Sequence, residues 1–418
     1  MVTTDPDPDT LTASLAGYAR RLHAVIGDRH HVASPLGAWL LLALCGPATG
    51  GADRGALTQV LGCDVEAAAR IAADLLSSPH PLVASAAAVW TRRGSPLSGG
   101  FPAWQSGLPA AVQTGALPGQ AELDAWARDH TFGLIERFPL RVDPAVRLIL
   151  ATALATRVSW QVPFALAPAR DLGAQSPWPG SLSQVLRTPR PGPGRSTAHR
   201  QFIAVTPEAG DVAVHLAQAQ GGLLVTSVAA AADVASGDVL AAAQRLGSAC
   251  AIGGPVQRRP LAELPLGAAP LWVVREESGP GGSEDAFTAV LPAWSARSKL
   301  PLTDPSLGFG PAVRALAGGG WDAAQAAMAR YSRTGFEAAA VTAVMAMSAV
   351  RAPRPGRRRA AELRFGHPYA VVAVAVDERR LGPWHGVPVF SAWVTDPEEA
   401  TADEPAPGGL AASRPGPT

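Results

Sequence analysis

The chain has 418 residues, of which 47% are hydrophobic and 17% are charged, and its formal net charge is +1 at pH 7. This hydrophobic fraction is ample for a large buried core, and the near-zero net charge gives no broad basic field for binding nucleic acid. The three cysteines (Cys45, Cys63 and Cys250) are too few and too scattered for a disulfide framework or a zinc site, so we predict neither a metal nor a cofactor.

The N-terminal sequence M-V-T-T-D-P-D-P-D-T is acidic and lacks the basic and apolar regions of a signal peptide. No apolar run reaches the length of a membrane-spanning helix, which needs about 18 residues or more. The sequence therefore predicts a cytoplasmic protein without a membrane partner, and it leaves export by another route open.

Apolar spacing and turn residues divide the chain into helices in its first part and mainly strands afterwards. Helices are predicted from Leu11 to Val25, from Leu36 to Cys45, around Leu57–Leu61 before Gly62, and from Leu123 to Phe138. Strands are predicted at Val83–Thr91, Val146–Val158, Thr288–Leu300, Tyr369–Val376 and Val387–Thr395. Residues 187–200 are predicted to form a loop, and 204–274 are ambiguous between helix and strand. This order predicts one α+β domain over residues 10–397, between a disordered N-terminus (1–9) and a disordered C-terminal tail (398–418).

The familiar sequence motifs of catalysis are absent. The chain lacks a phosphate-binding loop, a G-x-S-x-G elbow, an H-E-x-x-H pair and paired C-x-x-C motifs, and Lys299 is its only lysine. The adjacent pair His30-His31 is more typical of a solvated loop than of a ligand set. We therefore predict that the chain is not an enzyme.

The segment Arg333–Arg351 (R-T-G-F-E-A-A-A-V-T-A-V-M-A-M-S-A-V-R) is apolar and rich in alanine, and it runs directly into R-A-P-R-P-G-R-R-R. Three interpretations fit its residues: an alanine-rich helix, a buried strand, or an exposed loop that can become a strand. In an extended strand, every second side chain would face inward. From Phe336 onward that set is small, since it continues with Ala338, Ala340, Thr342, Val344, Ala346 and Ser348.

Motifs along the chain resemble those of the serpin family. The segment G-F-E-A-A-A-V-T-A-V (Gly335–Val344) resembles the serpin hinge, which usually reads G-T-E-A-A-A-A-T-A. F-G-H-P-Y at Phe365–Tyr369 and V-F-S-A-W-V-T-D-P at Val389–Pro397 are similar to two family motifs near the C-terminus. Similar motifs begin upstream at Ala33 (A-S-P-L), Ala88 (A-V-W), Asp124 (D-A-W-A-R-D-H-T-F-G-L-I), Leu148 (L-I-L-A-T-A-L-A-T-R-V-S-W-Q-V-P-F) and Leu291 (L-P). The resemblance covers about residues 10–400, and 165–285 match poorly.

The resemblance implies a serpin fold with three β-sheets, about eight or nine helices and an exposed reactive-centre loop. It also implies suicide inhibition of a serine-type endopeptidase, in which the protease cleaves the loop, forms an acyl-enzyme and is dragged along as the loop inserts into the central sheet. The hinge would comprise Gly335, Phe336, Glu337, Ala338, Ala339, Ala340, Val341 and Thr342. Family spacing puts the reactive bond between Ala349 and Val350, with Arg351 as the alternative. Such a bond suits an elastase- or subtilisin-like protease better than a trypsin-like one, and the inhibitor would be a monomer.

One departure from the family pattern bears directly on inhibition. Phe336 stands where the family has Thr or Ser, at the first inward position of the inserting strand, and overpacking there would cost about 1–3 kcal/mol. Slower insertion would let the protease escape. The alternative prediction is therefore a non-inhibitory serpin that acts as a binding or structural protein.

Other departures lie where the sheet opens, and the residues of that region are Ser34, Thr152, Trp160, Ala293 and Arg333. Thr152 replaces an asparagine of the family pattern. Ala293 and Arg333 occupy positions that form an ion pair in many serpins, and both partners are missing together. The run 351–359 lengthens the loop beyond the family norm, and it is predicted to be a solvated extension or a contact surface for a protease or polyanion.

Overall fold

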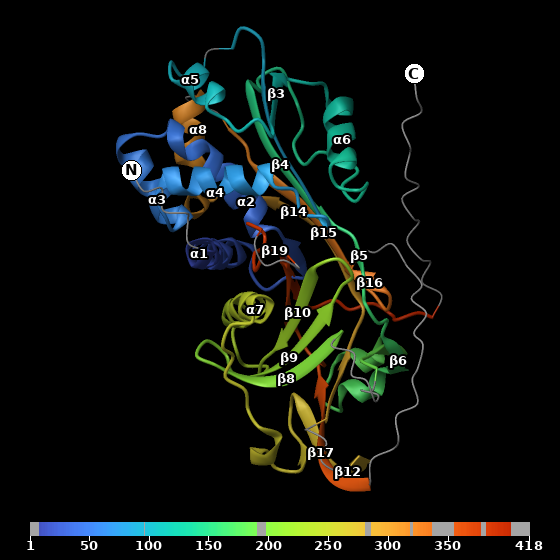
Figure 1. Cartoon of the computed structure of the whole chain (residues 1–418). Helices are drawn as coiled ribbons and strands as arrows, with labels where there is room; N and C mark the ends of the chain where they lie inside the picture. The colour runs from blue at the N-terminus through green and yellow to red at the C-terminus, as the bar shows by residue number, and fades with distance from the viewer. Residues whose placement is uncertain are drawn as a thin grey trace, which may run out of the picture.

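The computed structural model describes residues 8–95, 97–189, 198–280, 286–317, 321–336, 355–377 and 382–402. Within these ranges, eight α-helices and nineteen strands form an α+β architecture (Figure 1). The α+β class is therefore confirmed. None of the helices in the described part is long and apolar enough to cross a membrane.

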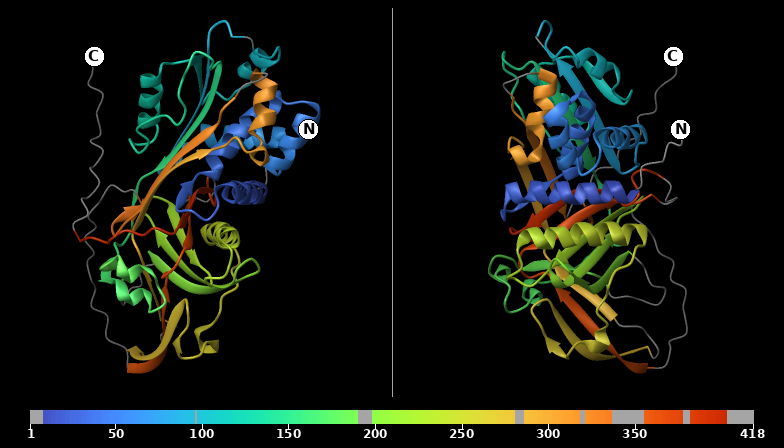
Figure 2. Two further views of the ribbon diagram at one scale, coloured as in Figure 1. Left: turned by 180° about the vertical axis from the view of Figure 1, so that it is seen from behind. Right: turned by 90° about the vertical axis from the view of Figure 1, so that its left-hand side faces the viewer.

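The helices begin and end at residues that favour helix termini. Ser34 accepts a hydrogen bond from the Gly37 amide and so caps the second helix, which Pro35 starts. Gly62 ends the third helix with φ of 75°, a conformation that suits glycine. The helices are α1 (Pro8–Ile26), α2 (Pro35–Cys45), α3 (Gly51–Leu61), α4 (Val65–Ser77), α5 (Phe101–Ser106), α6 (Gln120–Asp129), α7 (Ser236–Ile252) and α8 (Phe309–Ala317). Figure 2 shows α1 and α7 side by side across the middle of the molecule, with α2–α5 and α8 gathered at one end.

The first sheet has six strands and lies against α7. Its strands, in spatial order, are β1 (His31–Ala33), β19 (Pro388–Val394), β18 (Tyr369–Ala375), β10 (Leu223–Ala229), β9 (Gly210–Gln218) and β8 (His199–Thr206). All residues of β10, β18 and β19 are buried. Strands from both ends of the sequence therefore share one core.

The second sheet also has six strands and forms the opposite end of the molecule (Figure 1). In spatial order they are β11 (Gly267–Ala268), β12 (Trp272–Pro280), β17 (Pro355–Arg364), β13 (Ala286–Leu291), β7 (Gln184–Arg187) and β6 (Ala165–Pro168). The run predicted at 351–359 is a strand from Pro355 onward and not an extension of the loop, although the Arg357 side chain is 88% exposed, as a solvated run predicts. Two arginines of β17 pair with acids on β12, in the pairs Arg357–Glu276 and Arg358–Glu277. Residues 351–354 lie outside the described ranges.

The third and fourth sheets are connected by one continuous stretch of chain. The third contains, in order, β14 (Trp294–Pro301), β15 (Ala324–Tyr331), β16 (Gly335–Phe336) and β5 (Val158–Ser159). The fourth contains β3 (Val112–Ala116), β2 (Val83–Thr91) and β4 (Leu148–Thr156). Only Arg157 separates β4 from β5, so one stretch of chain contributes to both sheets. The described residues thus form four sheets, because no ladder joins β4 to β15. A ladder between these two strands would merge the third and fourth sheets and give the three sheets that the resemblance implies.

Several predicted boundaries need correction. Helix α6 ends at Asp129 instead of Phe138, because the chain turns at Phe132 and Gly133 with φ of 53° and 80°. The predicted strand Thr288–Leu300 is two strands, β13 and β14, separated at Pro292-Ala293. Helix α1 begins at Pro8, inside the range predicted to be disordered.

Candidate functional site

The start of the alanine-rich segment is already part of a sheet. Phe336 pairs with Tyr331 of β15 on one side and with Val158 of β5 on the other. The chain reverses between β15 and β16 in a tight turn, where the Ser332 amide donates to the Gly335 carbonyl at 2.9 Å. The amides of Trp160 and Phe164 donate to the carbonyls of Thr334 and Arg333 in this turn, at 3.0 and 2.9 Å. Residues 332–334 are called the hinge turn below.

The Phe336 ring fills an aromatic pocket. It is 3% exposed, and its ring meets those of Trp294 and Tyr331 edge-on at centroid distances of 6.3 and 6.5 Å. Trp160 lies 5.0 Å from Tyr331 and donates from Nε1 to the Ser332 carbonyl at 3.0 Å. The sequence predicted that Phe336 has still to enter the sheet when the loop inserts. The ring is instead accommodated before any cleavage, because edge-on aromatic contacts suit its shape.

A buried polar chain links Tyr331 to the first sheet. The Tyr331 hydroxyl lies 3.5 Å from His215 Nδ1, His215 Nε2 lies 3.1 Å from His199 Nδ1, and His199 Nε2 lies 2.7 Å from the Val162 carbonyl. Burial lowers the pKa of His199 to about 4, and burial together with His199 lowers the pKa of His215 well below its usual value. Both rings are therefore neutral at pH 7, so each can donate from one nitrogen and accept at the other.

A groove separates β4 from β15 beyond Phe336. It encloses a cavity of about 260 Å³ lined on one side by Leu150, Thr152 and Leu154 and on the other by Gln325 and Ala326. A smaller hollow, lined by Leu154, Ala327 and Phe336 among others, continues it to β16. The groove therefore starts where the described part of the alanine-rich segment ends.

Helix α2 bridges the two walls of this groove through side chains. The Thr152 hydroxyl donates to the Gly37 carbonyl at 2.8 Å, which ties β4 to the helix. From β15, Gln325 Nε2 donates to the Ser34 carbonyl and Gln325 Oε1 accepts from the Ser34 amide, both at 2.8 Å. The Ser34 hydroxyl donates to the Val389 carbonyl of β19, also at 2.8 Å. The groove is held at this point by polar contacts with α2, and not by a ladder between its walls.

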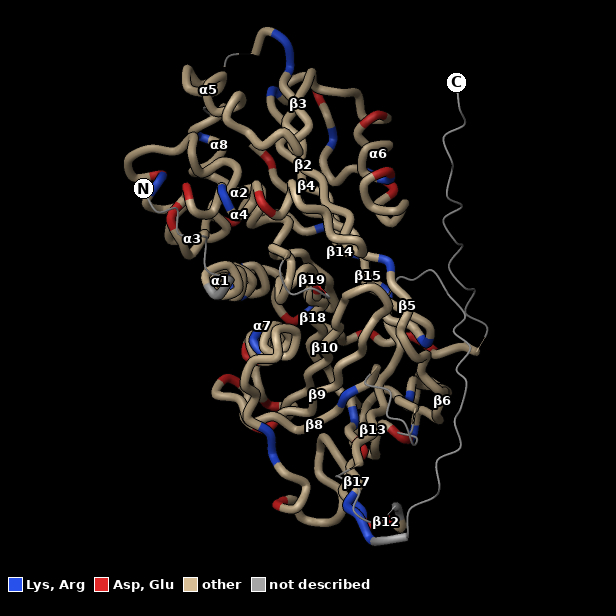
Figure 3. Tube along the Cα trace, viewed as in Figure 1, with Lys and Arg blue, Asp and Glu red and all other residues tan. Residues whose placement is uncertain are grey.

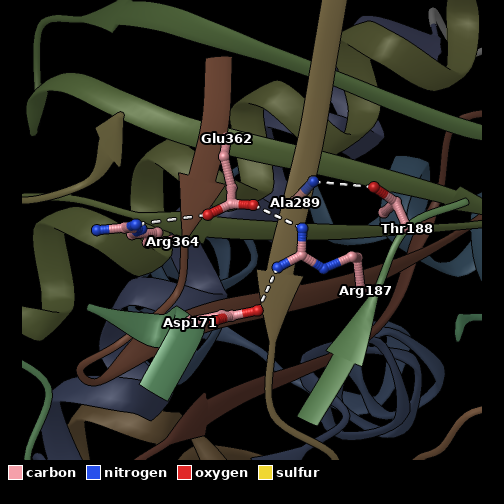
Figure 4. Close-up of polar contacts among 6 residues, drawn as sticks. All are labelled: Asp171, Arg187, Thr188, Ala289, Glu362 and Arg364. Carbon is pink, nitrogen blue, oxygen red and sulfur yellow. Dashed lines mark hydrogen bonds and ion pairs between the residues drawn. The ribbon is translucent and has the colours of Figure 1, made fainter. Parts of the chain in front are cut away.

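The segment returns to the fold at β17, which is fixed in the second sheet. It pairs with β12 over nine positions from Trp272↔Leu363 to Pro280↔Pro355, and with β13 in parallel. Figure 4 shows Arg187 of β7 between two carboxylates: Nη1 donates to Glu362 at 2.7 Å and Nη2 to Asp171 at 2.6 Å. Glu362 is also 3.5 Å from Arg364. Figure 3 shows the Arg residues of β17 at the tip of this sheet.

Other proteins of known structure share this arrangement of helices and sheets. No protein-family profile and no curated protein sequence matches the chain. Among solved structures, Serpin48 from the insect Tenebrio molitor matches with 15% identity and a TM-score of 0.59, covering 93% of this chain and 99% of that chain. Tengpin, a thermophilic serpin in its native state, matches with 10% identity and a TM-score of 0.63, covering 95% and 96%. The chain has the serpin fold.

The solved structures with this fold include proteins whose names describe different functions. Human thyroxine-binding globulin matches about as well as the two serpins above, with 11% identity and a TM-score of 0.59 over 93% of this chain and 98% of that one. At such identities the likeness concerns the fold alone, and the activity has to be argued from the site.

The predicted site residues fall into two groups along the groove of this serpin fold. Trp160 and Arg333 lie at the hinge turn, and Ala293 lies beside the aromatic pocket as the residue before Trp294. Ser34 and Thr152 lie farther along, where α2 bridges the walls. The remaining hinge residues Glu337–Thr342 and the reactive-bond residues Ala349, Val350 and Arg351 lie outside the described ranges.

The sequence did not reveal Gln325 or Tyr331. Both lie on β15, a strand that the sequence-based assignment missed. Gln325 contacts a residue 291 positions away, so no local pattern could have found it. The one available signal was alternation, since Gln325, Ala327, Ala329 and Tyr331 share the inward face of the strand.

Proposed function

We propose that the chain is a serpin-type inhibitor of serine endopeptidases, with its bait at Ala349–Val350 or, alternatively, at Arg351. The observation that supports this most strongly is the position of β16. Two residues of the hinge already lie between β15 and β5, and an open groove continues beyond them. A cleaved loop could extend β16 along this groove, pair with both walls and release the free energy of the unfilled sheet.

The pairing register gives this proposal a specific form. Continued without a bulge, it would bring Ala338 between Thr156 and Ala329, and Ala340 between Leu154 and Ala327. Thr342 would then lie between Thr152 and Gln325, the two polar residues that reach α2. The one polar residue in this part of the inward set would thus meet the polar part of the groove. Small residues would face the cavity elsewhere, as a strand that slips between packed walls requires.

Because β17 is fixed in the second sheet, the loop would have to be cleaved before it could insert fully into the groove. A strand from Phe336 to Ala346, opposite Leu148 at the far end of β4, would advance about 33 Å along the groove. The chain from Ala346 to Pro355 could span at most about 32 Å. Pro355 is the first residue of β17 in the second sheet, and Figure 1 shows β17 on the other side of β16 from β4. An uncut loop could therefore insert fully only if β17 left its sheet.

The alternative, a non-inhibitory serpin that binds or has a structural role, depended on the cost of inserting Phe336. Since the ring is buried in the uncleaved protein, that cost does not fall on the step after cleavage. The first inward residue that remains to insert is Ala338, which has a small side chain. The small side chain at this position favours the inhibitor over the non-inhibitory alternative.

The test is incubation with elastase-, subtilisin- and trypsin-like proteases, followed by denaturing electrophoresis and sequencing of the released fragment. We expect a detergent-resistant covalent complex with an elastase- or subtilisin-like enzyme and a fragment that begins at Val350. Thermal unfolding should shift upward after cleavage. Thr342→Arg, which would bury a charge in the groove, should be cleaved without forming the complex. Clean cleavage of the unmodified chain by every protease, with no complex and no thermal shift, would contradict the proposal.

A further inference from the structure

The chain beyond β19 crosses the molecule to reach the hinge. Residues 396–402, called the C-terminal strap here, run past β16 to the far side of the fold (Figure 1). The sequence predicted disorder from residue 398 onward. That prediction is wrong for 398–402, because these residues are bonded to three separate parts of the structure. Ala400 is 2% exposed.

The first part of the strap is attached beside the aromatic pocket. The amides of Thr395 and Asp396 donate to His30 Nδ1 at 3.1 and 3.3 Å. The Glu398 amide then donates to the Ala293 carbonyl at 2.7 Å, and its carboxylate accepts from the Ser295 hydroxyl. Ala293 immediately precedes Trp294, whose ring contacts Phe336.

Glu399 anchors the middle of the strap. Its two carboxylate oxygens accept from the amides of Ser183 and Gln184 at 2.8 and 2.7 Å. The Ala400 amide donates to the Gln184 carbonyl at 3.2 Å. Charge-assisted bonds from two adjacent amides fix a carboxylate in both position and orientation. The strap is therefore tied to the beginning of β7 in the second sheet.

The last described part of the strap reaches the hinge turn. Arg333 Nη2 donates to the Ala402 carbonyl at 3.2 Å, and the Arg333 carbonyl accepts from the Phe164 amide. Arg333 and Ala293 are the two positions whose ion pair is missing from this sequence. The strap contacts both of them, since the Glu398 amide bonds to the Ala293 carbonyl and the Ala402 carbonyl accepts from the Arg333 side chain. Main-chain groups of the strap thus connect two positions that an ion pair would connect directly.

We propose that the C-terminal strap is a positioning element of the hinge. It holds the hinge turn in place, so that β16 stays between β5 and β15 as the point from which the rest of the loop inserts. Without the strap, the Arg333 side chain loses its bond to the Ala402 carbonyl, and Ala293 loses its bond to the Glu398 amide. The pairing of β16 with β5 and β15 should then break more often. The effect of the strap on inhibition rests on the function proposed above, whereas its stabilisation of the hinge turn does not.

Two truncations separate the strap from the residues that follow it. One chain ends at Pro397 and lacks the strap contacts from Glu398 onward, and the matched control ends at Ala402 and keeps them. Amide hydrogen exchange of a peptide covering residues 331–336 is measured on uncleaved protein. Loss of the strap should speed this exchange by about tenfold, the factor expected for one lost hydrogen bond of typical strength. The control should exchange as the full chain does.

Glu399→Ala in the full chain keeps the proposal testable if the shorter truncation does not fold. It removes the carboxylate anchor and leaves the rest of the strap intact, so it should speed hinge exchange in the same direction. Unchanged exchange in Glu399→Ala, or in the folded Pro397 truncation, would overturn the proposal.

Formation of the covalent complex with protease supplies a second readout. Strap variants should yield less complex and more cleaved, free chain than the Ala402 control. Suppose that neither the full chain nor any variant forms the complex, and that loss of the strap still speeds hydrogen exchange at the hinge. The proposed inhibitory function is then refuted, and the positioning role of the strap is supported. Equal complex yields together with equal exchange would refute the strap alone.

Discussion

Gln325→Leu removes the side chain that connects β15 to α2 while keeping a similar volume. The Ser34 amide loses its acceptor, and the Ser34 carbonyl loses one donor but still accepts from the Ala38 amide at 3.4 Å. An orphaned buried amide costs about 1–3 kcal/mol and a lost neutral hydrogen bond about 0.5–1.5 kcal/mol, so we expect a loss of about 2–4 kcal/mol. For a domain of this size the unfolding entropy is about 0.8 kcal/mol/K, and the melting temperature should fall by about 2–5 °C.

Thr152→Val is the matched control on the opposite wall of the groove. It removes the single bond to the Gly37 carbonyl, which also serves the helix, so it should cost about 0.5–1.5 kcal/mol. Both variants are compared by calorimetry of the uncleaved protein. Since Gly37 donates to the Ser34 hydroxyl, the double variant should deviate from additivity. A shift for Gln325→Leu no larger than that for Thr152→Val would refute the reasoning.

Two further outcomes are expected from the region around the hinge. Phe336→Ala should destabilise the uncleaved protein by about 3–5 kcal/mol in thermal unfolding, because it empties a buried aromatic pocket; a loss below about 1 kcal/mol would show that the ring is not packed there. Stability should also fall as pH drops from 6.5 towards about 4, because the unfolded chain binds a proton that the half-buried His199 resists in the folded protein. In His199→Gln, urea midpoints should vary less with pH over this interval, and an undiminished variation would exclude this residue as the source.

Elements with strong local signals could be predicted from the sequence. The strand Val83–Thr91 has the predicted bounds, since Arg92-Arg93-Gly94 ends it clearly. Helix α3 ends at Gly62 as predicted, because a left-handed cap there needs glycine. The serpin hinge motif also led to the correct fold, although the overall identity to solved serpins is low.

What could not be predicted depends on contacts between distant residues. The apolar patterns of β4 and β15 gave no sign that a groove separates these strands, because an unpaired wall has the same residues as a paired one. Phe336 was taken for an obstacle because the pocket around it is built from Trp294 and Tyr331, on two other strands. The strap was taken for a disordered tail because it belongs to a stretch of Pro, Gly, Ala and acidic residues, whereas its main-chain groups and two Glu carboxylates bond to residues far away in the sequence.

The position of β18 and β19 has a consequence for the protein after it is cut. Both strands follow the proposed bait in sequence, yet β18 lies between β19 and β10 in the interior of the first sheet. Cleavage at Ala349–Val350 would therefore turn one polypeptide into a complex of two fragments that share a single core. Its unfolding would become a dissociation, and its melting temperature would rise with protein concentration. Refolding would require the fragments to find each other, so the cut molecule would behave as a heterodimer.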